Sequence, residues 1–530
     1  MPNTQILTQN FKYRLINSLL DSIKEDTNNL YFFYARPFEI NDDSQIEKPE
    51  NSTAYQTAIK SNILSLKRIN AIDLALGTKR YEWLAGTKYV AYDDALDLSD
   101  KRYFIITDEG NVYLCLNNNN TVSTYKPTST STEFIVTEDG YVWKYLYTVS
   151  SGLQRKFNIN EYIPLFQDEN VKNNAIPGTI NRIEIIINDD EIDHSTLIPN
   201  IPNIELDEIP LFIQGTGDVI RGSTINVMTN ASGNIVAFDR ASFRSNEVEY
   251  KSIGDKWVPV QFVPNHASVT KIAYGMVKLD QTNRIDNEKI FVINGGEGYA
   301  STACEIMQSS CIAYAKFDTN NKLTRVEIPE YGENFTTAEV VPIVSPELVE
   351  YFSFRPIVSP SRGYGYNVFL DTRASTLLIN VRIAYEEIEG NFTTQNNFRT
   401  IGLIDAVHER SSNGDIFPAI SSTLSGMTTL EFENANEIAM FELNSLITAS
   451  NGAVGKIVDK YDKYIRIIQN VEDTNSIEFI AGYNIQNRNI INVNKSSYVA
   501  QSGSILFIDN RLPIERHPDQ IETINLILNI

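Results

Sequence analysis

The chain has 530 residues, of which 42% are hydrophobic and 21% charged, a composition typical of folded proteins that excludes wholesale disorder. Lys and Arg total 45 against 67 Asp and Glu, which gives a formal net charge of −22. A nucleic-acid partner is therefore disfavoured, because no basic surface remains to neutralise phosphates. The length predicts about three to four domains.

The first residues, Met1-Pro-Asn-Thr-Gln-Ile, lack the basic and apolar stretches of a signal peptide, and no apolar run reaches the about 20 residues of a membrane span. We therefore expect no signal peptide and no membrane insertion. The three cysteines, Cys115, Cys304 and Cys311, form neither a disulfide framework nor a CxxC metal pair. Folding in a reducing cytoplasm is expected.

Apolar residues at spacings of three and four predict an amphipathic helix over residues 8–24. The aromatic run over 30–37 ends at a proline and predicts a buried strand. A second helix is expected over 54–72. Two apolar runs within 103–116 flank the turn Asp108-Glu-Gly110, which predicts a hairpin.

Residues 141–147 alternate so that Tyr141, Trp143, Tyr145 and Tyr147 share one face of a strand. Trp83 and Trp143 are interpreted as core residues, with an interface role or a carbohydrate platform as the alternatives. Burial of one such ring removes about 150–250 Å² from water.

Short β-branched and aromatic runs broken by Gly, Asn, Asp and Pro dominate residues 170–500 and are typical of β-sandwich or small β-barrel modules. Within them, residues 292–299 recur loosely as 327–335, which aligns Tyr299 with Phe335. We interpret this as a duplication of two β-units, each with a turn capped by an aromatic plug.

A further small β-module is expected from three short strands, at 452–458, 464–468 and 477–482.

Chemical motifs are sparse. The four histidines, His194, His266, His408 and His517, have no Cys or second His at ligand spacing. The segment 295–298 has no P-loop Lys-Ser/Thr and is interpreted as a turn.

The acidic cluster over 189–194 is interpreted as a solvated loop, with a Ca²⁺ site as the alternative. No pair of carboxylates stands out as the acid and base of a glycosidase. We therefore predict no catalytic, cofactor-binding or metal-binding residue, and no cofactor.

Four stretches, in order along the chain, resemble the baseplate wedge subunit of T4-like contractile-tailed phages, the gene eight product family. The motifs are Arg80-Tyr-Glu-Trp83 with Gly86-Thr-Lys-Tyr89, Glu138–Tyr147 followed by Glu161–Pro164, Asn397–Ile404, and Ser502–Ile514 with Asp519–Leu528. The resemblance covers roughly residues 1–165, 365–410 and 500–530. The intervening segments make this chain longer than the enteric-phage member of the family.

The resemblance implies a mainly-β protein with α+β parts: a Greek-key β-sandwich core with inserted small β-modules and a few N-terminal helices. The expected parts are an N-terminal core part (1–165), inserted β-modules (166–365) with the duplicated unit at about 290–345, a return to the core (366–415), an inserted β-module (416–500) and a C-terminal core strand (501–530). The structural core candidates are Trp83, Tyr141, Trp143, Tyr145, Phe398, Arg399, Arg511 and Pro513, and the repeat plugs are Tyr299 and Phe335.

The implied function is that of a non-enzymatic virion component. It would be made in the host bacterial cytoplasm, reside in the tail baseplate as a homodimer within each wedge, bind other wedge proteins, and transmit receptor engagement to sheath contraction. The first alternative is a receptor- or glycan-binding protein at the virion periphery, in which Tyr299 and Phe335 would be exposed. The second is a tail-associated glycan hydrolase.

Overall fold

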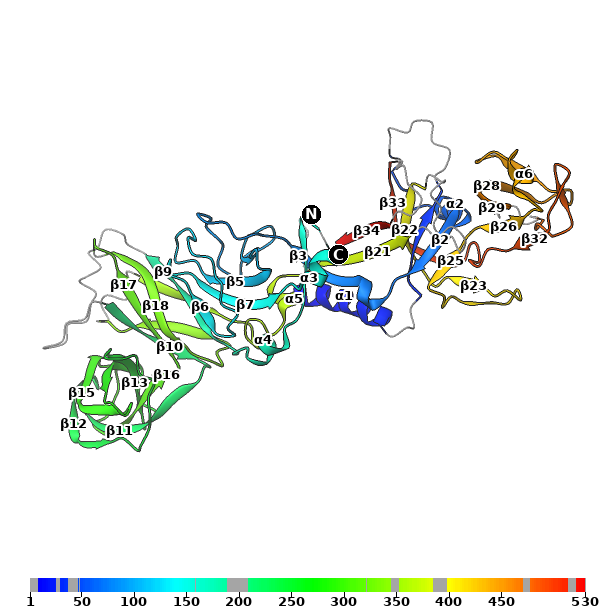
Figure 1. Ribbon diagram of the computed structural model, residues 1–530. Coiled ribbons are helices and arrows are strands. Elements are labelled where there is room, and N and C mark those ends of the chain that lie inside the picture. The colour runs from blue at the N-terminus through cyan, green and yellow to red at the C-terminus, as the bar shows by residue number, and fades with distance from the viewer. Residues whose placement is uncertain are drawn as a thin grey trace, which may run out of the picture. The chain divides into compact units, whose positions relative to one another are not determined.

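Antiparallel strands dominate the molecule (Figure 1), with 46% of residues in strands and 10% in helices. The expected mainly-β fold with few helices is thereby confirmed. The structure is a computed structural model that describes residues 8–24, 29–36, 46, 48–157, 159–187, 208–320, 322–344, 352–384, 398–469, 477–512 and 521–529.

The chain divides into two compact units, each assembled from segments that are far apart in the sequence. Unit 1 comprises residues 1–78, 152–164 and 374–530, and unit 2 comprises 79–151 and 165–373. Unit 2 is thus inserted into unit 1.

Unit 1 contains most of the helices. They are α1 (Gln9–Lys24), α2 (Thr53–Ser61), the 3-10 helix η1 (Ala71–Asp73), α3 (Ser151–Lys156) and α6 (Ala435–Ile438). Its strands are β1 (Tyr31–Ala35), β2 (Ile63–Arg68), β3 (Leu74–Lys79), β8 (Tyr162–Pro164), β21 (Thr376–Ala384), β22 (Thr400–Asp405), β23 (His408–Arg410), β24 (Ile416–Pro418), β25 (Thr423–Ser425), β26 (Thr428–Glu431), β27 (Leu446–Thr448), β28 (Val454–Tyr461), β29 (Tyr464–Ile468), β30 (Asn484–Ile485), β31 (Arg488–Asn489), β32 (Asn492–Asn494), β33 (Ser504–Asn510) and β34 (Ile521–Asn529).

A five-stranded antiparallel sheet with the order β25-β2-β1-β22-β33 joins both ends of unit 1. β1 occupies its centre because all five residues of this strand, Tyr-Phe-Phe-Tyr-Ala, are buried. β22 pairs with β1 from Tyr31↔Ile404 to Ala35↔Thr400, and β33 pairs with the other edge of β22. The core of this sheet therefore depends on three segments that are distant in sequence.

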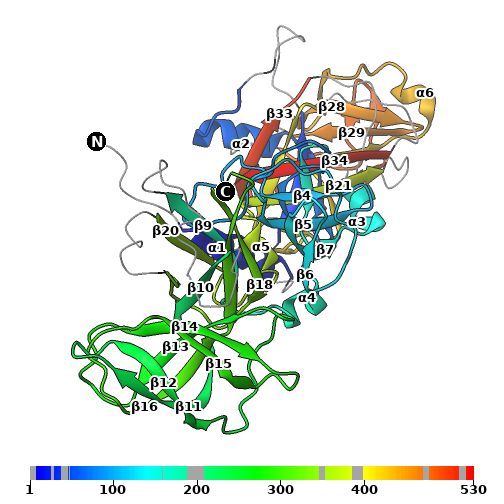
Figure 2. The same ribbon diagram turned by 90° about the vertical axis from the view of Figure 1, so that its left-hand side faces the viewer.

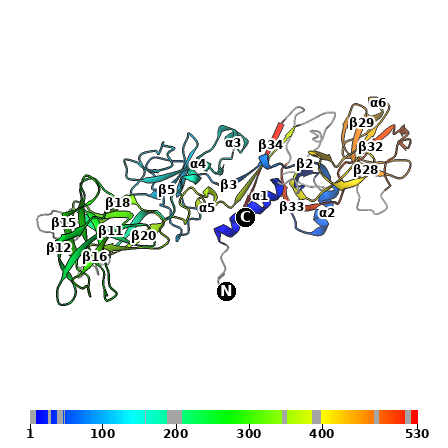
Figure 3. The ribbon, with the colours of Figure 1, turned by 90° about the horizontal axis from the view of Figure 1, so that it is seen from below.

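A second sheet of unit 1 has the order β34-β21-β3-β8, and β34 pairs with β21 along the full length of that strand. A separate module has the order β27-β28-β29-β26-β32, with α6 beside β29 (Figure 3). Phe432, Ile457 and Phe479 are at the centre of its core.

Most helices and strands of unit 2 are strands. They are β4 (Phe104–Ile106), β5 (Asn111–Asn117), β6 (Phe134–Val136), β7 (Val142–Thr148), β9 (Ile180–Ile187), β10 (Glu208–Gly215), β11 (Val219–Thr229), β12 (Ile235–Arg244), β13 (Val258–Pro264), β14 (Ala273–Leu279), β15 (Ile285–Asn294), β16 (Ala303–Ser309), β17 (Cys311–Phe317), β18 (Leu323–Tyr331), β19 (Ala338–Pro342) and β20 (Phe352–Val358). Two short helices, α4 (Glu169–Asn173) and α5 (Val368–Asp371), complete it. β4 and β5 form the expected hairpin, and the first sheet has the order β4-β5-β7-β6.

Six consecutive strands of unit 2, β11–β16, roll into a small barrel, named barrel A (green, lower left in Figure 1). The order of its strands is β12-β11-β16-β13-β14-β15. Its two outer strands meet where Ile235 N donates a hydrogen bond to Gly295 O at 2.8 Å. Val260, Phe262 and Ile306 lie in its core.

Strands β9, β10 and β17–β20 form a second six-stranded assembly, named barrel B. The sheet β18-β17-β10-β19 is completed by the antiparallel pair β20-β9, with β9 beside β18 and β20 beside β19. One core joins the two parts and includes Ile183, Leu211 and Phe352. Barrel A is inserted in the sequence between β10 and β17, which pair with each other in barrel B. Figure 2 shows β10 and β18 of barrel B above barrel A.

The two barrels share one strand order. In barrel A, β13 lies between β14 and β16, with β15 outside β14; in barrel B, β10 lies between β17 and β19, with β18 outside β17. Tyr299 precedes β16 and Phe335 precedes β19, so the two aromatic plugs occupy the same place in each barrel. Both rings are buried in the respective barrel cores.

The turns that carry Tyr299 and Phe335 also have matching backbone hydrogen bonds and glycine conformations. Tyr299 N donates to Gly233 O at 2.8 Å, and Phe335 N donates to Gly178 O at 3.1 Å. Both glycines have positive φ, +74° and +61°. A Cβ atom at Gly233 would lie 2.8 Å from Tyr299 N, and one at Gly178 would lie 2.3 Å from Phe335 N. Each turn thus requires a glycine opposite its aromatic residue.

Two element predictions were wrong. The helix expected over 54–72 ends at Ser61. Residues 63–68 form β2, because this run pairs with β1 and β25 and its first four residues are buried in the sheet. The strand expected at 477–482 is absent; Phe479 is buried in the module core, and the segment ends in a turn at Gly482.

The expected N-terminal part, 1–165, is divided between the units. Residues 79–151 belong to unit 2, because Val171 of α4 packs into the core of their sheet. The predicted returns at 366–415 and 501–530 contribute β21, β22, β33 and β34 to unit 1.

Substitution of Gly178 by Ala tests the glycine requirement of barrel B. Gly254→Ala is the matched control, because Gly254 has φ +57° but nothing within 4 Å of its would-be Cβ. The control should cost about 1 kcal/mol of stability through backbone strain alone. Gly178→Ala should cost at least about 2 kcal/mol more, measured as a lower thermal unfolding midpoint. Equal midpoints for the two variants would contradict the required close approach.

Candidate functional site

The core candidates of the first motifs gather in one aromatic cluster of unit 2. Tyr141, Trp143 and Tyr145 of the β7 region pack with Tyr89, and Trp83 packs against them from the edge. The rings of Tyr141 and Trp143 stack with centroids 5.3 Å apart, and Trp83 Nε1 donates to Ser123 Oγ at 3.1 Å. Trp143 is fully buried, so this ring is a core residue and no ligand platform.

The C-terminal candidates meet in unit 1. Phe398, Arg399 and Arg511 line one cavity of only about 10 Å³, and Arg511 N donates to Arg399 O at 2.7 Å. Phe398 also packs on Tyr34, with ring centroids 4.6 Å apart. These residues therefore brace the junction next to β22 and β33. Pro513 and the acidic cluster 189–194 lie outside the described residues.

The two repeat plugs are anchored inside their barrels. The relative exposure is 4% for Tyr299 and 2% for Phe335. Tyr299 Oη donates to Phe262 O at 2.6 Å and accepts from Ala273 N at 2.9 Å. Burial is the main reason why the pKa of Tyr299 is raised above its usual value.

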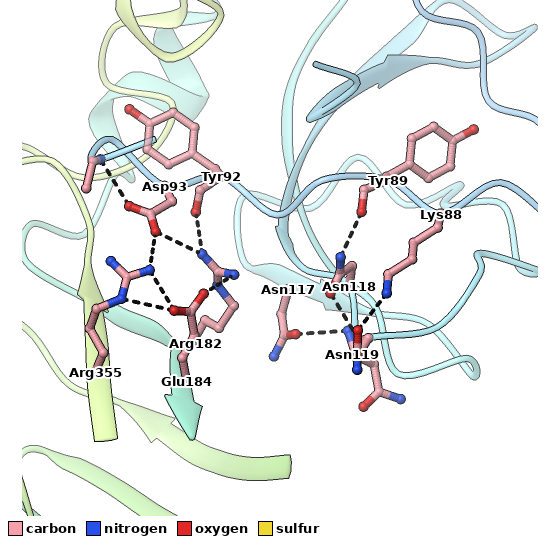
Figure 4. Close-up of polar contacts among 12 residues, drawn as sticks. Lys88, Tyr89, Tyr92, Asp93, Asn117, Asn118, Asn119, Arg182, Glu184 and Arg355 are labelled. Atoms are coloured by element: carbon pink, nitrogen blue, oxygen red, sulfur yellow. Dashed lines mark hydrogen bonds and ion pairs between the residues drawn. The ribbon is translucent and has the colours of Figure 1, made fainter. Parts of the chain in front are cut away.

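An asparagine-rich turn beside the aromatic cluster is held by its own side chains (Figure 4, right). Asn118 Nδ2 donates to Tyr89 O at 2.8 Å, and Asn119 N donates to Asn117 Oδ1 at 2.9 Å. Lys88 Nζ donates to Asn120 Oδ1 at 2.6 Å. These bonds are local turn chemistry, since Asn119 and Asn120 both adopt positive φ.

A four-residue ion network in unit 2 joins distant segments (Figure 4, left). Arg355 of β20 donates to Asp93 at 2.5 Å and to Glu184 of β9 at 2.6 Å. Arg182, also of β9, lies 2.8 Å from Glu184 and 3.5 Å from Asp93. The network therefore ties the β9/β20 pair to the loop that carries Asp93.

Asp93 is the buried centre of this network, with 1% of its side chain exposed. Burial opposes its ionisation, but the hydrogen bond from Arg355, the Ala95 N–H, and the charges of Arg355 and Arg182 outweigh it. The pKa of Asp93 is therefore below its usual value, and the pKa of Arg355 is raised by its hydrogen bonds to Asp93 and Glu184.

A groove of about 370 Å³ opens beside the network. Its lining comes from three segments of unit 2: residues 93–95, Phe335 with Thr336, and residues 355–361. Ion-paired Arg355 and the exposed carboxylate of Asp94 are its charged groups besides Asp93. No sequence motif predicts this groove, because residues 93–95 are more than 200 residues away from the other two lining segments and none of the three belongs to a recognisable site pattern.

A buried acid lies elsewhere in unit 2. Asp371, at the end of α5, accepts a hydrogen bond from Gly365 N at 2.6 Å. Complete burial raises its pKa to about 7, although the Gly365 hydrogen bond and the nearby charge of Lys144 act against that rise. Burial in turn lowers the pKa of Lys144.

Within the part of the chain that the structure describes, no three His, Cys, Asp or Glu side chains gather as metal ligands. All three cysteines are buried, and desolvation raises the pKa of each thiol, that of Cys304 to about 11. None of these thiols is poised as a nucleophile. Among the described helices, none is long and apolar enough to cross a membrane.

Comparisons with known proteins add no relative: no family model matches the chain, and no curated protein matches it.

The ion network predicts that alanine substitution of Asp93 lowers stability much more than alanine substitution of the adjacent Asp94. Asp93→Ala should cost about 2–3 kcal/mol, because two guanidinium groups lose a buried carboxylate. Asp94→Ala should change stability by at most about 0.5 kcal/mol, since this side chain is exposed. Chemical denaturation of both variants measures the difference, and equal losses would rule out the network as a brace.

Asp371 predicts a fall in stability with rising pH. Below the unfolded pKa, near 3.8, both states hold a neutral acid; between that value and the folded pKa of about 7 only the unfolded state is ionised, so folding becomes less favourable as pH rises. The loss should be of the order of 4 kcal/mol and level off above the folded pKa. Asp371→Asn, which keeps an acceptor for Gly365 N, should remove this part of the pH dependence in denaturation curves between pH 4 and about 8. An unchanged profile would contradict the assignment.

Proposed function

We propose that the chain is a structural component of a contractile phage tail baseplate wedge. In this role it links wedge subunits and helps to transmit receptor engagement to baseplate rearrangement and sheath contraction. The virion baseplate is the proposed location, other wedge proteins and a second copy are the proposed partners, and no enzymatic activity is proposed.

One observation carries the proposal: the stretches that resemble the wedge family supply strands of the two main sheets of unit 1 and of the first sheet of unit 2. Glu138–Tyr147 provides β7, with Trp143 at the centre of the aromatic cluster. Asn397–Ile404 leads into β22, and the C-terminal stretch provides β33 and β34, which complete the two main sheets of unit 1. A resemblance at core strands concerns the scaffold itself rather than an appended loop.

The surface of unit 1 offers apolar side chains that a subunit of an assembly would bury. Phe11 and Leu15 are exposed one helical turn apart on α1, and Ile72 of the adjacent η1 is 76% exposed. Leu446 of the small module is exposed as well. Clusters of this kind are typical of protein contacts.

Individual residues argue against the two alternative functions, a peripheral binding protein and a glycan hydrolase. A peripheral binder that uses the aromatic plugs needs exposed rings, but Tyr299 and Phe335 are buried. A glycan hydrolase needs an acid with a raised pKa in a cleft, whereas Asp93, beside the groove, has a lowered pKa and is engaged by two arginines.

Co-expression with the tail proteins encoded in the same genome tests the proposal. The chain should co-purify in a complex of defined mass with one or more of them, as measured by light scattering. Gly254→Ala serves as the control variant, because it changes an open turn. A chain that joins none of these proteins but binds a host-surface glycan would refute the wedge assignment.

The net charge of −22 predicts that this assembly weakens with salt. Basic faces on the partners should meet the acidic surface, and such contacts lose strength as the Debye length falls from about 10 Å at 0.1 M to about 3 Å at 1 M salt. Sedimentation across this range should show progressive dissociation at unchanged secondary structure. A complex indifferent to salt would contradict charge-driven contacts.

A further inference from the structure

The internal repeat shows that barrel B lacks a pairing that barrel A has. In barrel A, β11 pairs with β16 from Val219↔Ser309 to Asn226↔Ala303. The corresponding strands of barrel B are β20 and β19, since β19 follows the Phe335 turn and β20 pairs with β9, the strand that begins after Gly178. β20 and β19 lie side by side but belong to different sheets, and no strand ladder joins these two described strands.

The groove lies at this unpaired seam. Phe335 and Thr336, just before β19, line one wall, and residues 355–361, from β20 and the loop after it, line the other. In barrel A the same region is closed by direct bonds: Val227 N donates to Thr302 O at 3.0 Å, and Thr229 N donates to Ser301 Oγ at 3.2 Å. Barrel B holds a cavity of about 370 Å³ instead.

We propose that this groove is a binding site for an extended segment of a partner polypeptide that carries basic side chains. Each of β19 and β20 is paired along one edge, with β10 and β9, which leaves the edges toward the seam without a ladder. An extended peptide recognises such edges through its own backbone N–H and C=O groups. The cavity volume falls in the range of about 300–1,000 Å³ that is usual for binding sites.

The charge of the occupant follows from the groove lining. Arg355 is matched by Asp93 and Glu184 within the network. The Asp94 carboxylate is exposed at the groove, and the described residues form no ion pair with it; the nearby Arg373 donates to the Asp94 backbone O at 3.4 Å and does not line the groove. The groove thus presents net negative charge, which favours lysine or arginine in the occupant. A second copy of the chain, at −22, is a poorer match.

The wall next to Arg355 is firmly placed, so the site exists before the partner arrives. The Asp93 network fixes β20 relative to the loop at 93–95, and Ser359 N donates to Thr179 O at 2.8 Å just beyond the strand. A site that is formed in advance loses little conformational entropy on binding. This inference holds for any basic extended partner and is independent of the proposed function.

The test uses the full chain and a short labelled peptide that alternates lysine and valine, at about 0.15 M salt. Two matched peptides serve as controls: one alternates glutamate and valine, and the other keeps lysine and valine but is N-methylated at every second backbone nitrogen. The lysine peptide should bind, and both controls should bind at least about tenfold more weakly. Hydrogen exchange should slow in β19 and β20 of the complex.

Two variants place the peptide in the groove. Ser361→Trp fills the groove from an exposed position and should weaken binding at least about tenfold. Asp94→Arg reverses the charge and should weaken binding about fivefold, whereas Glu249→Arg, at an exposed carboxylate of barrel A, should change it by less than about twofold.

The proposal is overturned if the lysine peptide does not bind, if Ser361→Trp and Asp94→Arg bind it like the unmodified chain, or if exchange slows elsewhere. Concentration-dependent dimers that Ser361→Trp abolishes would also overturn it and would assign the groove to a second copy of the chain.

Discussion

Antiparallel pairing between segments far apart in the sequence is the constraint on which the rest of this structure depends. β1 is buried on both faces and has no stable position until β2 and β22 cover its two edges. β22 is in turn paired with β33, so the N-terminal, middle and C-terminal parts of the chain must meet before the first sheet exists. All of unit 2 lies between these strands in the sequence. Closing so long a loop has an entropic cost that grows only slowly with length, and a large insertion is therefore tolerated.

The same principle recurs inside unit 2. Barrel A begins and ends between two paired strands of barrel B, and its own first and last strands are paired where it starts, at Val219↔Ser309. Each barrel then closes around an aromatic ring held opposite a glycine with positive φ. The units are thus arranged as nested insertions along the chain, and each inserted part has its own core. Its distant segments need bracing, and the buried Asp93 network supplies a brace between the β9/β20 pair and an earlier loop.

Sequence patterns predicted the features that depend on neighbouring residues. The apolar stripe of α1, the aromatic run of β1 and the hairpin of β4 and β5 are all local signals. The repeat of Tyr299 and Phe335 was visible because both turns keep a glycine and an aromatic residue at matching places. Residues 63–68 were wrongly predicted as helix because a helical period and a strand period are hard to separate in a short apolar run. Pairing with β1, which is set by tertiary structure, decides that case.

The candidate site could not have been predicted, for the same physical reason. Its charged residues, Asp93, Arg182, Glu184 and Arg355, come from three segments, and only the pairing of β9 with β20 brings Glu184 opposite Arg355. The groove lies where the described strands β19 and β20 share no ladder, and an absent interaction leaves no motif in the sequence. The internal repeat is what makes it recognisable, because barrel A shows the same fold with that seam closed. Barrel A can therefore be used as a reference for barrel B. Both have six strands, but only barrel A pairs the two strands at this seam, and the open seam in barrel B is the place where an extended segment of another chain could pair.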